Sequence, residues 1–288
     1  MGILLCKPGD GVWMAEETRS ERLPCPFTWP CMPCAGPGCM AVCCQQSREC
    51  LCMEKRTGHE ISRMPCVPGV CSMGFSACGR YLYQLSSEAD CIHARCVASG
   101  ELLYAAPAGV FPRCMKMGDK GKLLLCAGGA VNEASLFNAP DLTIARTITT
   151  RHPCFAADFW QDGLVLVCAA EGDDIRTVIE TLPAKAVRPR RLAELPGSPG
   201  TLCVCPDQCT ALISTRGGLC RISLKTGELL WNVPELALCM RVECQDGQIL
   251  VSDTVDGNIW LLSLNRPWEK RLLAQKEDSQ ACFLHGRV

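Results

Sequence analysis

The sequence predicts an all-β fold, a seven-bladed β-propeller of four-stranded antiparallel blades, with residues 1–288 forming a single propeller domain. Three observations predict it. Cysteine-led units recur with a period of about 41 residues, the length of a propeller blade. The two ends of the chain complete one such unit, and three outer hairpins share one spacing of glycine and proline.

Each repeat unit consists of an apolar strand led by cysteine, a turn that often carries Asp-Gly or Gly, two further apolar strands, and a fourth strand that ends near proline. Seven cysteines lead such units: Cys31, Cys71, Cys114, Cys154, Cys203, Cys239 and Cys282. The spacing is typical of blades that are each a four-stranded sheet. Two stacked β-sandwiches of unrelated short strands are the competing architecture, and they require no fixed period.

The two ends of the sequence fit together as one unit. Cys282 leads an innermost strand, residues 3–6 fit the second strand and residues 11–15 the third, so that residues 1–25 complete the last blade. Pairing these segments in one sheet closes the ring and removes the exposed edges of an open array.

Three outer hairpins support the same architecture. Each has a Thr-Gly or Ser-Gly pair followed, seven residues after the glycine, by a proline: Gly58 and Pro65, Gly100 and Pro107, Gly227 and Pro234. Glycine supplies the positive φ of a tight hairpin, and proline ends an outer strand.

Two segments carry a resemblance to known families. The stretch SLKTGELLWNVP is similar to the outer hairpin of a quinoprotein blade, and CQDGQILVSDTVDGNIWLL to the inner part of a WD-repeat blade. The chain thus resembles the WD-repeat, YVTN and quinoprotein-like propeller families, without a Trp-Asp dipeptide or a paired Gly-His. The resemblance implies a platform for binding or, in some members, an enzyme with its site at the channel mouth.

Composition narrows the setting. The formal net charge is -1 with 20% charged residues, so we expect neither a nucleic acid nor a membrane as partner. The first residues lack a basic segment and a cleavage site, and Cys6 stands where a myristoylation pattern needs Ser or Thr. We expect a cytoplasmic monomer, with most of the 25 cysteines as reduced thiols.

Alternation along the innermost strands predicts a site at the channel mouth. Successive side chains of a strand point to opposite faces. The residue after each leading cysteine is mostly apolar, whereas the face that carries the cysteine also carries charged residues further along, which suits a solvated channel. The predicted site comprises Cys31, Cys71, Cys114, Cys154, Cys203, Cys239, Cys282, Lys116, Asp158, Asp207, Arg241 and Glu243. The cysteines are either small side chains where strands converge or a ring for a soft metal ion or redox chemistry. No cofactor is predicted.

The turns between second and third strands are expected to form an acidic rim on one face. Its acids are Asp10, Glu49, Glu88, Asp90, Glu133, Glu171, Asp173, Asp174, Asp253 and Asp256, against the bases Lys7, Arg48 and Arg216. Such a rim attracts cations or a protein or peptide with a basic surface. The alternative is turn chemistry, because Asp beside Gly is favoured in tight turns whatever the partner.

Other patterns are open to metal, redox or polyanion interpretations. Residues 31–52 hold seven thiols, which suggest a zinc or iron–sulfur site or simple core filling. Adjacent Cys43 and Cys44 resemble the vicinal pair of quinone dehydrogenases, and residues 185–191 form a basic run. The four histidines, His59, His93, His152 and His285, fall in different units.

The leading function is a non-enzymatic binding module that presents the acidic rim and channel mouth to a protein, peptide or cationic ligand. The alternative is an enzyme at the channel mouth, either a metal-assisted hydrolase or lyase or a redox protein using thiols or a quinone. Such chemistry needs convergent carboxylates, histidines and arginines on innermost strands.

Overall fold

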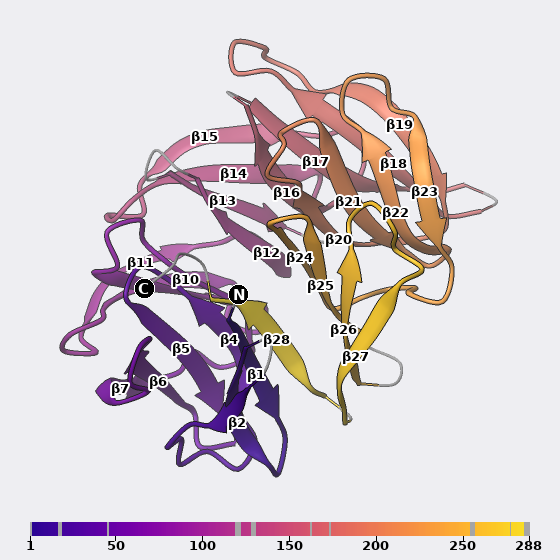
Figure 1. Ribbon diagram of the computed structural model, residues 1–288. Helices are drawn as coiled ribbons and strands as arrows, with labels where there is room; N and C mark the ends of the chain where they lie inside the picture. The colour runs from indigo at the N-terminus through magenta and orange to yellow at the C-terminus, as the bar shows by residue number, and fades with distance from the viewer. Residues whose placement is uncertain are drawn as a thin grey trace.

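The chain is an all-β propeller of four-stranded antiparallel blades (Figure 1). This computed structural model describes residues 2–284 except 17, 18, 45, 119–121, 128–130, 162, 173, 254–256 and 277, and describes only the backbone of residues 122–127. In the described part, no helix is long and apolar enough to cross a bilayer.

The strands are given sheet by sheet, starting from the strand nearest the centre. Along the chain come β4 (Cys31–Ala35), β5 (Cys39–Cys44), β6 (Glu49–Glu54) and β7 (Glu60–Pro65); then β8 (Val70–Phe75), β9 (Tyr81–Ser86), β10 (Cys91–Cys96) and β11 (Leu102–Pro107). Next are β12 (Pro112–Met117), β13 (Lys122–Ala127), β14 (Glu133–Asn138) and β15 (Ile144–Thr149).

The remaining sheets follow the same order. They are β16 (Cys154–Trp160), β17 (Gly163–Ala170), β18 (Arg176–Leu182) and β19 (Arg190–Pro196); β20 (Pro199–Val204), β21 (Thr210–Thr215), β22 (Gly218–Ser223) and β23 (Leu229–Val233); and β24 (Arg241–Gln245), β25 (Gln248–Ser252), β26 (Asn258–Ser263) and β27 (Lys270–Gln275). The closing sheet is β28 (Gln280–Phe283), β1 (Ile3–Lys7), β2 (Gly11–Ala15) and β3 (Ser20–Arg22).

The first strands of successive sheets contact one another around the ring, and β28 contacts both β24 and β4. Six of the seven predicted leading cysteines lie in these first strands, whereas Cys239 precedes β24 by two residues. Strand pairing gives seven four-stranded sheets. Six of them count as propeller blades, one fewer than the seven predicted. The closing sheet has the shortest strands, with three residues in β3 and four in β28.

The predicted pairing of the two ends is confirmed. Strand β28 pairs antiparallel with β1, with Phe283 opposite Ile3 and Cys282 opposite Leu4. Figure 1 shows the yellow β28 beside the indigo β1. Phe283 is 0% exposed, so this strand contributes core as well as backbone hydrogen bonds.

The predicted outer hairpins are also confirmed, and the structure explains their glycines. Gly100 and Gly227 have φ of 74° and 76°, values that residues with a side chain rarely adopt. A Cβ at Gly227 would lie 2.5 Å from the carbonyl oxygen of Leu192 in the preceding sheet. Glycine is therefore required both for the turn and for close packing of the hairpin on its neighbour.

The hydrophobic core lies between neighbouring sheets, and cysteine fills much of it. Most described cysteines are buried, and all of them are thiols rather than disulfides. Cys220, for example, packs with Ile213 and Ile222 in one cluster, and Cys244 packs with Val242 in another. Cysteine here takes the place of a small hydrophobic side chain.

Candidate binding site at the channel and the acidic face

Four of the five predicted charged channel residues come together in two pairs on innermost strands. Lys116 of β12 lies with its Nζ 3.6 Å from Oδ2 of Asp158 on β16. Arg241 and Glu243, both on β24, form an ion pair with Nη2 2.6 Å from Oε1. Strand alternation therefore placed these four side chains on the predicted face.

The channel carboxylates also hold the backbone of the next sheet. Asp158 Oδ2 accepts a hydrogen bond from the Val204 amide of β20 at 3.0 Å. Glu243 Oε2 accepts one from the Phe283 amide of β28 at 2.7 Å. Arg241 Nη1 donates to the Pro33 carbonyl oxygen of β4. These side chains connect innermost strands of different sheets, so they hold the structure together.

The two pairs compensate one another electrostatically. Burial alone would lower the pKa of Lys116, but Asp158, with smaller contributions that include Glu243, raises it above its usual value. Burial alone would also lower the pKa of Arg241, but Glu243, with further contributions from Cys282 and Cys34, raises it. These two cations are thus balanced by two carboxylates.

Asp207, the fifth predicted charge, does not lie with them. It occupies the turn between β20 and β21, where Oδ1 accepts hydrogen bonds from the Cys209 and Thr210 amides at 2.8 and 3.0 Å. Arg221 Nη2 lies 3.3 Å from its Oδ2. Burial raises its pKa, but these hydrogen bonds outweigh burial, and the net pKa lies below the usual value. Alternation failed here because β20 ends at Val204.

The leading cysteines do not share one environment. Cys31, Cys71 and Cys114 are half-buried, whereas Cys154, Cys203, Cys239 and Cys282 are buried. Four of the innermost strands carry a bulge at the leading cysteine, between Cys31 and Cys34, Val70 and Ser72, Pro112 and Cys114, and Cys154 and Ala156. A bulge inserts an unpaired residue and so disturbs the alternation on which the predicted ring depended.

Cys154 shows the consequence of such a bulge. It lies beside Cys168 in the core of its sheet, away from the face of Asp158. This arrangement favours the core-filling interpretation of the leading cysteines. No group of three or more His, Cys, Asp or Glu side chains is arranged around a metal position in the described residues.

Glu180 on β18 lies beside the thiols of Cys154 and Cys168, and its ionisation should make stability depend on pH. Burial raises its pKa; His152 and Arg151 oppose this and Cys154 adds to it, leaving the net pKa above the usual value. A carboxyl whose pKa is raised on folding loses stability as pH rises from about 4.3 through the raised value. Glu180→Gln should therefore unfold at a higher temperature than the wild type at pH 7, and at the same temperature near pH 4. Thermal melts across this range would test it; a variant that is less stable at pH 7 would contradict it.

The turns between second and third strands share a face with the connections between sheets. Backbone hydrogen bonds join the two kinds of segment, from the Cys66 amide to the Arg48 carbonyl at 2.8 Å and from the Ala108 amide to the Asp90 carbonyl at 2.9 Å. In a third sheet the direction is reversed, and the Arg216 amide of the turn donates to the Ser198 carbonyl of the connection at 3.0 Å. The acids assigned to the rim therefore belong to one face of the molecule.

The described rim acids differ in exposure. Glu88, Glu133, Glu171 and Asp174 are exposed, and Asp10, Glu49 and Asp90 are half-buried. Asp253 is 5% exposed, so it is not a surface charge as predicted. Asp173 and Asp256 lie outside the described residues.

The exposed rim acids, Glu88, Glu133, Glu171 and Asp174, form no ion pairs in the described part of the chain. Besides the expected bases, Arg151 and Lys276 stand in the connections of this face, which the sequence interpretation overlooked. One of the expected bases, Lys7, lies 4.9 Å from the Trp13 ring.

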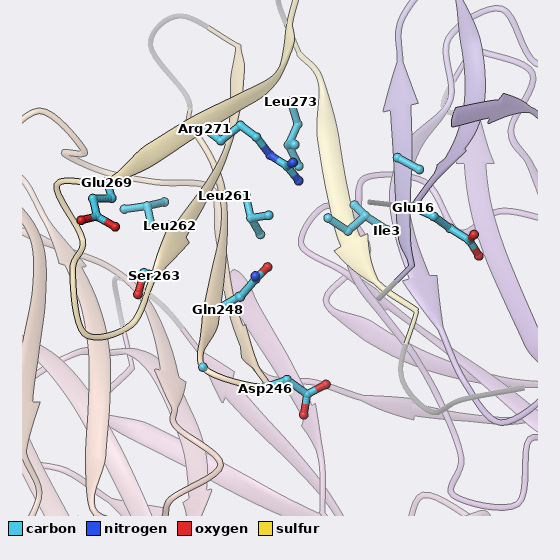
Figure 2. Close-up of a pocket in the computed structure, with 12 residues that line it drawn as sticks. Ile3, Glu16, Asp246, Gln248, Leu261, Leu262, Ser263, Glu269, Arg271 and Leu273 are labelled. Atoms are coloured by element: carbon cyan, nitrogen blue, oxygen red, sulfur yellow. The ribbon is translucent and has the colours of Figure 1, made fainter. Parts of the chain in front are cut away.

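A cleft of about 540 Å³ lies between the β24–β27 sheet and the closing sheet (Figure 2). Figure 2 shows Leu261 and Arg271 on one side and Ile3 and Glu16 on the other. Glu269, also at this cleft, is paired with Arg266 at 3.2 Å. Sequence reasoning missed the cleft; only the predicted pairing of the two ends brings residue 3 near residue 261.

The weaker candidates are dispersed. Cys43 and Cys44 belong to different core clusters, as neighbouring residues of a strand should. Residues 185–189 belong to the connection between β18 and β19, and Arg190 and Arg191 begin β19; His59 lies in the turn before β7 and His152 in the connection before β16. His285 is outside the described residues. His93, in contrast, lies opposite Gln84 in the sheet that packs against several thiols of residues 31–52.

No protein-family model matches the chain, and no curated protein matches it. Solved structures do. Hydrazine synthase of Kuenenia stuttgartiensis is 11% identical, with a TM-score of 0.73 over 86% of each chain. The chain has the propeller fold.

A second similar structure is the dihydro-heme d1 dehydrogenase NirN in complex with DHE. It is 18% identical, with a TM-score of 0.62 over 86% of this chain and 56% of that one. At these identities the likeness concerns the fold alone, which hosts many unrelated functions. The comparisons give no support to the WD-repeat resemblance.

Proposed function

We propose that the protein is a non-enzymatic binding module whose acidic face holds a protein or peptide with a basic surface. The supporting observation is the group of exposed acids, Glu88, Glu133, Glu171 and Asp174, which have no ion pair among the described residues. Charges of one sign on one face attract an oppositely charged partner and raise its association rate. Neither a nucleic acid nor a membrane is part of the proposal, which places the protein as a cytoplasmic monomer.

The channel supports binding over catalysis. A general base or nucleophile must be able to reach its substrate and change protonation state. Asp158 and Glu243 instead pair with Lys116 and Arg241 and accept hydrogen bonds from backbone amides. Using either carboxylate in a reaction would break contacts that hold two innermost strands together.

We further propose that the ring has seven blades, with the closing sheet as the seventh. The support is that β28 pairs with β1 and contacts the innermost strands on both sides, as a blade would. The closing sheet has the shortest strands of the ring, so this sheet is the one that a count of six blades leaves out.

A charge-matched pair of variants tests the acidic face. Glu171→Gln with Asp174→Asn removes two exposed rim charges, and Glu101→Gln with Glu228→Gln removes two exposed charges from hairpins at the opposite end of the strands. Fluorescence anisotropy with a labelled decalysine peptide would measure affinity between ionic strengths of about 0.01 and 0.15 M, where the Debye length falls from about 30 to about 8 Å.

We expect the rim variant to bind the peptide about two- to tenfold more weakly than the control at low salt, because the position of the charges matters as well as their number. The difference should shrink at high salt. Equal affinity of the two variants at every ionic strength would show that the rim does not bind cations, and the acids would then reflect turn chemistry.

A further inference from the structure

Five sulfur-bearing side chains meet between the sheet β4–β7 and the sheet β8–β11. They are Cys43 on β5, Cys50 and Cys52 on β6, Cys66 after β7, and Met73 on β8. Cys43, Cys50 and Cys52 are 0% exposed, Cys66 is 7% exposed and Met73 is 8% exposed. We call this group the sulfur cluster. It is enclosed in protein on all sides.

The sulfur atoms are in direct contact. Cys43 Sγ lies 3.1 Å from Met73 Sδ and 3.1 Å from Cys66 Sγ. Cys50 Sγ lies 4.0 Å from the same Met73 Sδ. Three thiols and one thioether from four segments of the chain are therefore linked by sulfur contacts in the core, although as they stand they are not arranged around a metal position.

The facing sheet turns three polar side chains toward the sulfur cluster. Gln84 of β9 and His93 of β10 are opposite one another in the pairing, and Arg95 follows His93 by two residues, so all three share one face. His93 Nδ1 and Arg95 Nε are buried and have no hydrogen-bond partner among the described residues, whereas the Gln84 side chain hydrogen-bonds the Cys50 thiol. Buried polar groups normally have partners, so the two unsatisfied nitrogens favour a further bound group beside the thiols.

Arg95 points to the charge of that group. Its side chain is 8% exposed, and its Nη1 donates to the Gly100 carbonyl oxygen at 3.2 Å. Burial lowers the pKa of Arg95, and the groups that oppose this are the thiols of Cys50 and Cys66 rather than a carboxylate. A buried cation is costly unless an anion lies beside it. Neutral thiols do not supply one, whereas thiolates bound to a metal ion do.

We propose that Cys43, Cys50, Cys66 and Met73 form a binding site for one soft metal ion, and that this ion is Cu(I). Thiolate together with thioether is the donor set that soft ions prefer, and a thioether is not among the usual ligands of zinc. Two of the three cysteines bind as thiolates and the third stays a protonated thiol, so that the Cu(I) complex carries a charge of -1, which Arg95 neutralises. The two ionising thiols release two protons to solvent as the ion binds, and no electron is transferred.

The site closes around the ion rather than standing open for it. With each sulfur about 2.3 Å from a metal ion, tetrahedral geometry separates the sulfurs by about 3.8 Å. The Cys50–Met73 distance of 4.0 Å already suits this, whereas the two 3.1 Å contacts of Cys43 must lengthen. Rotation of the Cys43 side chain to another staggered rotamer would lengthen both contacts.

The test uses the full chain with Cys78→Ser and Cys209→Ser as parent, because these two thiols are exposed and would bind copper on the surface. The parent is purified without oxygen, titrated with Cu(I) from a chromogenic chelator, and passed through gel filtration. We expect one copper per chain by elemental analysis and a rise in melting temperature. Zn(II) under the same conditions should bind at least tenfold more weakly.

Three further substitutions in this parent locate the site. Met73→Leu keeps the volume of the side chain and removes a ligand, and Arg95→Met removes the balancing charge; each should weaken Cu(I) binding about tenfold to a hundredfold. Cys220→Ala removes a cysteine that is 4% exposed in a different sheet and should leave the affinity unchanged. Circular dichroism without metal shows whether each variant is folded.

Several outcomes would overturn the proposal. Less than half a copper per chain in the folded parent would do so, as would equal losses in Met73→Leu and Cys220→Ala. Tighter binding of Zn(II), unaffected by Met73→Leu, would refute Cu(I). A Cys43–Cys66 disulfide found by mass spectrometry of the anaerobically purified protein would show that these thiols pair with each other instead.

Discussion

We expect that a chain without residues 280–288 forms no stable monomer. The deletion takes away β28, whose Ala281, Cys282 and Phe283 are at most 1% exposed, and it leaves β1 without its inner partner. An unpaired edge beside an uncovered core favours aggregation. Size-exclusion chromatography and limited proteolysis of the truncated chain would show aggregates or rapid cleavage.

A single substitution makes the same point without removing backbone. Phe283→Ala should lower the free energy of unfolding by about 3–5 kcal/mol, the usual cost of truncating a buried aromatic side chain. Trp268→Ala is the matched control, since Trp268 is 68% exposed, and its effect should stay within about 0.5 kcal/mol. If the truncated chain stays monomeric with unchanged thermal stability, the closing sheet does not hold the ring together.

The second large effect is expected in the channel. Asp158→Ala removes the partner of Lys116 and the acceptor of the Val204 amide. Leaving a buried donor unsatisfied costs about 1–3 kcal/mol, and we expect a loss of this size in the free energy of unfolding. Urea denaturation followed by tryptophan fluorescence would measure it. Glu235→Ala, at an exposed turn position without a positive φ, is the control and should change stability by less than about 0.5 kcal/mol.

A double variant separates charge from packing. Replacing both partners by apolar side chains, as in Lys116→Met with Asp158→Leu, should recover part of the stability lost in Asp158→Ala, because no uncompensated cation remains. If the double variant is less stable than the single one, the Asp158 carboxylate acts chiefly through the backbone of β20 rather than through Lys116.

Much of the fold could be predicted because each repeat unit has the same physical requirements as the others. Each unit needs an apolar inner strand, a hairpin glycine with positive φ and an outer strand that ends, so these signals recur at fixed offsets. The pairing of Cys282 with Leu4 followed from the same period. Alternation also placed Lys116, Asp158, Arg241 and Glu243, because each lies within a regular stretch of strand.

Local irregularity set the limit of that prediction. Bulges at Cys31, Cys71, Cys114 and Cys154 interrupt the alternation at the residues on which the predicted ring depended. Nothing in the composition of a strand marks such a bulge reliably. Asp207 was misplaced for a related reason, because its strand ends three residues earlier than the alternation assumed.

The sulfur cluster was out of reach for a different reason. The seven thiols of residues 31–52 suggested a zinc or iron–sulfur site or core filling, and no residue outside this stretch was included. The structure instead brings Cys43 and Cys50 to Cys66 and Met73, across a contact between two sheets. Which residues meet between sheets depends on how the sheets pack, and a single sequence does not give that packing.

The closing sheet also sets an order of events in folding. Strand β1 is made well before β28, and their contact joins residues roughly 280 apart in the chain. Closing so long a loop costs about 4 kcal/mol more chain entropy than closing a turn of about four residues. Contacts between distant residues slow folding. The other sheets can form as they are synthesised, each from one continuous stretch, whereas β1–β3 must wait for their inner strand. The time between those two events is when the chain is most exposed to misassembly and most dependent on chaperones.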